Sequence, residues 1–84
     1  GFSIDQMNLL KKGQLVVSEV VPESPASKSG LSKDDLILSI NEQVASYENL
    51  FKTFARSKPG DIVLLEILRN EETIDIRVIS GKLN

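Results

Sequence analysis

The spacing of apolar side chains predicts a chain built mainly from short strands. Residues 2–6 alternate between apolar and polar positions, which is typical of a strand with one buried face. Residues 14–21 and 61–69 are rich in valine, isoleucine and leucine and predict more fully buried strands. Residues 35–40 predict another buried strand, and residues 73–80 a last strand with one solvated face.

The segments between these strands predict turns and loops. Residues 8–13 are expected to form a loop that ends in a glycine turn, and Pro22 should end the preceding strand because it cannot donate to a sheet. Residues 41–44 are expected to turn into a brief extended stretch. Asn70-Glu71 predicts the tight turn that joins the last two strands.

Two segments carry helix signals. Ser24 is a candidate N-cap, Pro25 suits a first helical position and Gly30 closes a helix of one or two turns. The second helix is predicted over 47–57, with Ser46 as its N-cap. Its apolar residues recur at i, i+3, i+4 and i+7 and so form one stripe: Tyr47, Leu50, Phe51 and Phe54.

Short strands with hairpin-length connections favour an antiparallel sheet that bends on itself, because a flat sheet would leave an apolar face in water. The predicted fold class is α+β: a small, partly open antiparallel β-barrel or sandwich of five to six strands, capped by one short and one longer helix. Residues 1–84 are expected to form a single domain of a larger protein.

Composition narrows the possible chemistry. The chain has 84 residues, ten basic and twelve acidic side chains, no cysteine and no histidine. Disulfides, thiolate chemistry and the commonest general base and metal ligand are therefore excluded. The charges are spread along the chain, which gives no basic patch for nucleic acid. We expect no metal and no cofactor.

Three stretches resemble a known family. Residues 20–43, VVPESPASKSGLSKDDLILSINEQ, resemble the central signature of PDZ domains, especially those attached to bacterial proteases. The stretch KPGDIVLLEILRNEE at 58–72 is similar to the family's Pro-Gly strand and the turn after it. GFSI at 1–4 resembles the second half of the family's Gly-Leu-Gly-Phe loop, which opens the ligand-binding strand.

The resemblance has departures. Asp34 and Glu42 stand where the family has glycines, in turns that can require positive φ. An aspartate tolerates that conformation better than a glutamate. The chain starts at Gly1, within the loop whose N–H groups bind a peptide carboxylate in the family.

What the resemblance implies is a non-catalytic module that binds peptides by strand addition between residues 2–6 and the helix at 47–57. The partner would be a C-terminal or internal peptide, with an apolar last residue where the end is bound, and the module would present substrate to, or regulate, an attached protease. Tyr47 stands where many members have a histidine that selects a Ser or Thr two residues before the peptide's end. An apolar or mixed residue is therefore expected at that position of the peptide. The residues implied in binding are Gly1, Phe2, Ser3, Ile4, Asp5, Tyr47, Leu50, Phe51 and Phe54.

Other interpretations stay open at this stage. Leu50 and Phe54 could belong to the core, and Phe2 and Ile4 could simply complete the barrel. The groove could instead be filled by the parent chain, which would make the domain a docking element. Asp34-Asp35 is expected to be a solvated corner or local cap, not a cation site. The resemblance suggests a bacterial periplasm or cell envelope, and we expect the isolated domain to be monomeric.

Overall fold

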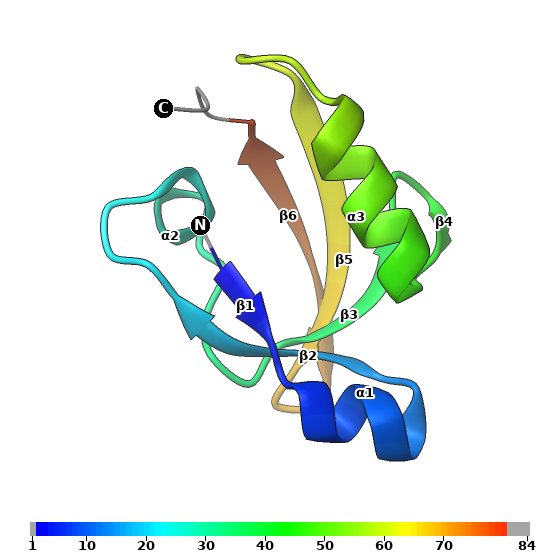
Figure 1. Cartoon of the computed structure of the whole chain (residues 1–84). Helices are drawn as coiled ribbons and strands as arrows, with labels where there is room; N and C mark the ends of the chain where they lie inside the picture. The colour runs from blue at the N-terminus through cyan, green and yellow to red at the C-terminus, as the bar shows by residue number, and fades with distance from the viewer. Residues whose placement is uncertain (1, 81–84) are drawn as a thin grey trace.

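The computed structural model describes residues 2–80, which form six strands and three helices (Figure 1). The predicted α+β fold class is confirmed. None of the helices in the described part of the chain is long and apolar enough to cross a membrane. In chain order the elements are β1 (Phe2–Ile4), α1 (Gln6–Lys12), β2 (Leu15–Val20), α2 (Pro25–Lys28), β3 (Leu36–Ile40), β4 (Gln43–Val44), α3 (Tyr47–Arg56), β5 (Ile62–Arg69) and β6 (Glu72–Ile79).

The strands form one antiparallel arrangement in the order β1-β2-β3-β5-β6, with β4 paired to β3. β1 and β6 are therefore the two ends of the strand order. The longest ladder joins β5 to β6, from Ile62 opposite Ile79 to Arg69 opposite Glu72. The predicted turn at Asn70-Glu71 closes this hairpin, with φ values of 50° and 66° that are typical of a type I′ turn.

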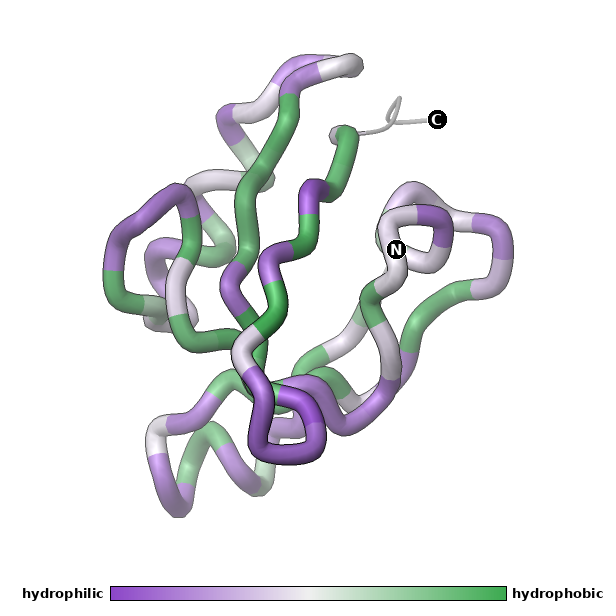
Figure 2. The backbone as a smooth tube through the Cα atoms, turned by 180° about the vertical axis from the view of Figure 1, so that it is seen from behind, coloured by the Kyte–Doolittle hydropathy of each residue, from purple (hydrophilic) through white to green (hydrophobic). Residues whose placement is uncertain are grey.

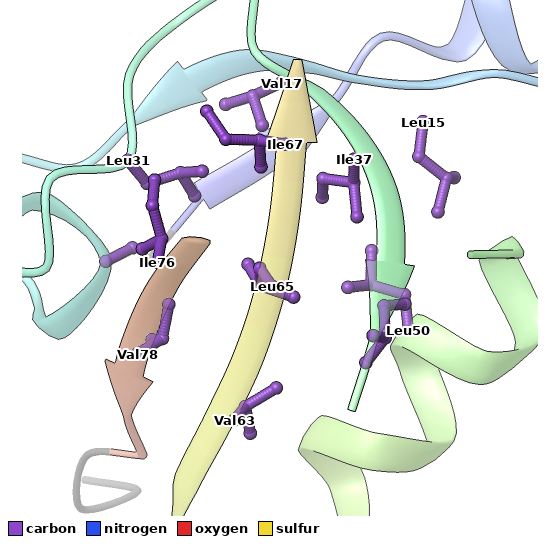
Figure 3. Close-up of a cluster of buried hydrophobic side chains, with 12 residues drawn as sticks. Leu15, Val17, Leu31, Ile37, Leu50, Val63, Leu65, Ile67, Ile76 and Val78 are labelled. Atoms are coloured by element: carbon purple, nitrogen blue, oxygen red, sulfur yellow. The ribbon is translucent and has the colours of Figure 1, made fainter. Parts of the chain in front are cut away.

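The hydrophobic core is built by β5 and by the elements that face it (Figure 3). Leu65 and Ile67 have no exposed surface, and Leu50 reaches into the same cluster from α3. Along β6, hydrophobic and hydrophilic residues alternate, whereas β5 is more continuously hydrophobic (Figure 2). This confirms that β6 keeps one solvated face.

The prediction for residues 5–13 was wrong, because a helix stands where a strand end and a loop were expected. α1 begins after Asp5, whose carboxylate accepts the backbone N–H groups of Met7 and Asn8. It ends at Gly13, which has the left-handed φ of 66° that closes helices. These are ordinary start and stop signals, but the apolar–polar alternation up to Gln6 pointed to a longer strand.

The other two helices follow their predicted caps. The Ser24 hydroxyl accepts the Ser27 N–H at the start of α2, and the Ser46 hydroxyl accepts the Asn49 N–H at the start of α3. α3 ends at Arg56, one residue before the predicted end.

Both positions that depart from the family's glycines have positive φ, 74° at Asp34 and 68° at Glu42. The turn geometry that the family's glycines favour is therefore kept without glycine.

Asp35 is not a solvated corner, because only 1% of its surface is exposed. Its carboxylate caps the Ser32 N–H and accepts two hydrogen bonds from Arg69, at 2.8 Å and 2.6 Å. These hydrogen bonds raise the pKa of the Arg69 guanidinium above its ordinary value. Arg69 also donates to the Gly30 carbonyl, so this pair ties the segment after α2 to the end of β5.

Candidate functional site

An open groove of about 740 Å³ runs between β1 and α3. β1 contributes one wall, α3 the other, and the ends of α2 and β6 close the space between them. The lining residues are mostly apolar and none carries a charge: Phe2, Ser3, Ile4, Gln6, Pro25, Ala26, Tyr47, Leu50, Phe51, Phe54, Ala55, Val78, Ile79 and Ser80.

The α3 wall arises from the helical stripe, but its residues are exposed to very different degrees. Leu50 is 7% exposed, so it belongs to the core and also forms part of the groove surface. Tyr47 and Phe51 are 48% and 66% exposed, which leaves their rings available to a partner. The two interpretations of Leu50, core or groove, are therefore both correct.

Phe2 and Phe54 meet across one end of the groove. Their ring centroids lie 5.8 Å apart and the ring planes are at 75°, which is an edge-to-face contact. Both side chains are half-buried and pack against the core cluster. This contact holds the start of β1 against the second half of α3 and fixes the width of the groove at that end.

The backbone of β1 has an edge that no described strand pairs. β1 stands at the end of the strand order and bonds only β2. The Asp5 N–H donates to the Val16 carbonyl of β2 at 2.8 Å. Because successive residues of a strand direct their backbone groups to opposite sides, Ser3 also faces β2, whereas Phe2 and Ile4 direct theirs toward the groove.

This alternation narrows the pairing edge, expected along residues 2–6, to the backbone groups of Phe2 and Ile4. Asp5 offers neither backbone group to the groove, since its carbonyl accepts the Leu9 N–H. Its side chain caps α1, and hydrogen bonds from Asn8 lower the pKa of its carboxyl. Ser3 lines the groove without contributing its backbone. Gly1, the remaining predicted residue, lies outside the described residues.

The arrangement gives little support for catalysis or metal binding. Glu48 and Lys52 form an exposed ion pair on α3 that lowers the pKa of Glu48, but neither residue lines the groove. Over residues 2–80 the structure shows no group of three or more acidic side chains that could hold a metal ion. What the groove can do is bury apolar side chains beside an unpaired strand.

Several lining residues were missed by the sequence analysis. Pro25 and Ala26 belong to α2, for which only the caps were considered. Val78 and Ile79 belong to β6, and Ser80 directly follows it. The bend of the sheet brings these residues to the groove, and no local sequence pattern predicts that bend. Ala55 and Gln6 adjoin predicted positions and could have been included from the helical and strand spacing.

Comparison with known proteins decides the family. The profile of the PDZ domain matches residues 4–79, nearly the whole chain. The chain belongs to the PDZ domain family. The expected resemblance is thereby confirmed, and the relatives are bacterial proteases.

Two protease sequences illustrate the similarity. The zinc metalloprotease RasP of Oceanobacillus iheyensis is 35% identical over 66 residues, which are 79% of this chain and 16% of that protein. The serine endoprotease DegS of Haemophilus influenzae is 38% identical over 66 residues, 77% of this chain and 19% of that protein. The chain thus spans less than a fifth of either relative's length.

A solved structure shows the same fold. The HtrA-type protease AlgW with a tripeptide superposes with a TM-score of 0.77 at 28% identity, over 96% of this chain and 30% of that one. The six antiparallel strands and their helices therefore match the PDZ fold found in this HtrA-type protease.

Proposed function

We propose that this domain captures the C-terminal end of a peptide by strand addition between β1 and α3. The observation that carries the proposal is the pairing of two features in one place: an unpaired strand edge at Phe2 and Ile4, and an uncharged, mostly apolar groove beside it. Strand addition uses the first for hydrogen bonds and the second for side chains. The similarity to a peptide-bound HtrA-type protease supports the proposal.

The energetics suit a reversible complex. Each added backbone hydrogen bond contributes about 0.5–1.5 kcal/mol net. Burial of one Val, Leu or Phe side chain against Leu50 and Phe54 contributes about 1.5–3 kcal/mol. A few such terms, less the free energy needed to order the peptide, correspond to a micromolar Kd, near −8 kcal/mol.

The bound peptide has an apolar last residue, seated at the end of the groove where Phe2 and Phe54 meet. The groove there is lined by Ala55, Val78 and Ile79, none of which offers a charge to a polar side chain. Tyr47 stands at the far end of α3 and favours an apolar or mixed residue at the position that it contacts.

In its parent protein the domain presents substrate to, or regulates, an attached protease and is not itself catalytic. This step rests on the two relatives named above, which are both proteases of different catalytic type: RasP is described as a zinc metalloprotease and DegS as a serine endoprotease. Similarity to segments of proteases with two catalytic chemistries fits a role in recognition rather than in bond cleavage.

The proposal is tested with heptapeptides that carry a free C-terminus and end in Phe, Leu, Val or Ile, followed by backbone chemical-shift mapping on the 84-residue chain. We expect the largest shifts at β1 and α3, and weaker binding of the same peptides when the terminus is amidated. Peptides ending in Asp or Lys serve as the comparison set. Shifts confined to other elements, or no preference for apolar ends, would refute the proposal.

Variants locate the binding surface. Phe54→Asp places a charge in the groove and should abolish binding, whereas Lys52→Ala, on the same helix but outside the lining, should leave the Kd unchanged. Because Phe54 is half-buried, the fold of the Asp variant is checked by circular dichroism. Phe51→Ala, at a 66% exposed position, gives a second test that leaves the core intact.

A further inference from the structure

β6 presents the longest unpaired strand edge in the described part of the chain. It lies at the end of the strand order opposite to β1 and pairs only with β5 (Figure 1). β6 has eight residues, whereas β1 has three. Its ladder with β5 runs without a register shift, and its sequence contains no proline or glycine. β6 therefore lacks the bulges and prolines by which proteins commonly prevent an edge strand from pairing with another chain.

The free backbone groups of β6 belong to alternate residues. The Ser80 N–H donates to the Asp61 carbonyl at 2.7 Å, and the Ser80 carbonyl accepts the Gly60 N–H at 2.9 Å, so the backbone of Ser80 faces β5. Successive residues of a strand direct their backbone groups to opposite sides, so the odd-numbered residues face away from β5. The side chains of these four residues are all exposed: Thr73, Asp75, Arg77 and Ile79.

α2 lies beside β6 but directs its donors into its own turns (Figure 1). The N–H groups of residues 27–31 all bond acceptors within residues 24–27. α2 therefore offers β6 none of these donors. Of the four edge residues only Ile79 also lines the groove, so the β6 edge and the groove are largely separate surfaces.

The exposed face of β6 carries two opposite charges at alternate positions, Asp75 and Arg77. Among the described residues neither of them takes part in an ion pair. Across the ladder, Asp75 lies opposite Glu66 of β5, and Arg77 lies opposite Leu64. Like charges directly opposite each other destabilise a strand pair, so a cation on the outer side of Asp75 would compensate an unfavourable pair of carboxylates.

A second copy of β6 supplies that cation. Two copies of one strand can pair antiparallel about a two-fold axis, each contributing the same residues. If the axis passes through Ile76, Asp75 of each copy lies opposite Arg77 of the other. Thr73 then lies opposite Ile79 in the same way. All of these opposing residues belong to the outer edge, so their backbone donors and acceptors match.

The charges favour this register over its neighbours. Opposing residues must have the same backbone orientation, so the allowed registers differ by two residues. A shift in one direction sets Asp75 against Asp75 of the copy, and a shift in the other direction sets Arg77 against Arg77. Of the three registers, only the one centred on Ile76 places both carboxylates opposite guanidinium groups.

We propose that β6 is a second interaction edge, through which two copies of this domain pair antiparallel into one continuous sheet. The proposal does not depend on peptide binding, because it uses the end of the strand order that lies opposite to β1. A single strand pair is a small interface, so we expect a weak dimer with a Kd of roughly 0.1–1 mM and a monomer in dilute solution.

The test is sedimentation equilibrium of the 84-residue chain from about 20 µM to about 2 mM, where we expect the mean mass to rise toward that of a dimer. Asp75→Arg sets guanidinium groups opposite one another and should raise the dimer Kd about tenfold or more. The double variant that combines Asp75→Arg with Arg77→Asp restores two opposite-charge pairs. Its dimer Kd should return to within about threefold of the native value.

Glu19→Arg is the matched control, because it makes the same change of net charge at an exposed position of β2 and should change the dimer Kd by less than about twofold. Thr73→Pro tests the backbone pairing without altering a charge. It removes an N–H that faces away from β5, so the circular dichroism spectrum should be kept while the dimer weakens about tenfold or more.

The outcomes decide the proposal without touching the proposed function, because Thr73, Asp75 and Arg77 do not line the groove. A chain that stays monomeric up to about 2 mM would overturn the dimer. Equal weakening by Asp75→Arg and Glu19→Arg, or a double variant that fails to recover, would show that the copies do not pair in this register.

Discussion

Glu71 is held in a conformation that a glutamate adopts at a cost, and glycine in its place should stabilise the domain. The residue has φ 66° and is the second central residue of the turn between β5 and β6. A left-handed conformation costs an L-residue about 1–2 kcal/mol. Glycine avoids that cost but loses about 0.5–1 kcal/mol more in chain entropy on folding. The midpoints of these two ranges give a net gain of about 0.75 kcal/mol for Glu71→Gly.

A domain of this size converts 1 kcal/mol into a Tm change of about 4–8 °C, so the expected rise is about 3–6 °C. Thermal unfolding followed by circular dichroism measures it directly. Glu72→Gly is the matched control, because it removes the same carboxylate from the first residue of β6, which is paired with Arg69. Glycine inside a strand should lower the Tm. If Glu71→Gly lowers the Tm as much as the control does, the strain assigned to this turn is absent and the reasoning fails.

Three further predictions test other parts of the structure. Asp35→Ala leaves Arg69 and the Ser32 N–H without their acceptor and should lower the free energy of unfolding by about 3 kcal/mol in urea titrations; a loss below about 1 kcal/mol would contradict the structural role of this pair. Asp5 has a lowered pKa when folded, so the stability it adds is complete above the ordinary carboxyl pKa of about 3.9 and is lost as the pH falls through the lower folded pKa. The Tm difference between the native chain and Asp5→Ala should therefore be constant from neutral pH down to about pH 5 and shrink below about pH 4; a difference unchanged at acid pH would argue against the charged cap. Leu50→Ala should cost about 2–4 kcal/mol because Leu50 is 7% exposed, whereas Phe51→Ala should change stability by less than about 0.5 kcal/mol; equal losses would contradict the assignment of only Leu50 to the core.

The strands, two of the three helices and one wall of the groove could be predicted from local patterns. The α3 wall was predicted from four apolar residues at helical spacing, and the start of α3 was predicted from its N-cap, Ser46. The error at residues 5–13 has a physical reason. Phe2 and Ile4 alternate with polar neighbours, and this pattern continues through Gln6, although Asp5 and Gly13 carry the signals of a helix start and end.

The other parts of the groove depend on tertiary structure. Val78 reaches it because β6 lies next to β5 in the bent sheet, and Ala26 because α2 packs close to β6. No spacing along the chain reports either contact. The free edge of β1 is similar: residues 2–6 predict a strand, but only the pairing of Asp5 with Val16 shows which backbone groups face the groove.

The groove separates residues that maintain the fold from residues free to set specificity. Leu50 and Val78 line it while belonging to the buried cluster, so a substitution that altered their size would change stability before it changed ligand choice. Tyr47 and Phe51 line the same groove at 48% and 66% exposure, where the core places little constraint on the side chain. Under the proposed function, substitutions at the exposed positions of α3 should therefore change peptide preference with little effect on stability.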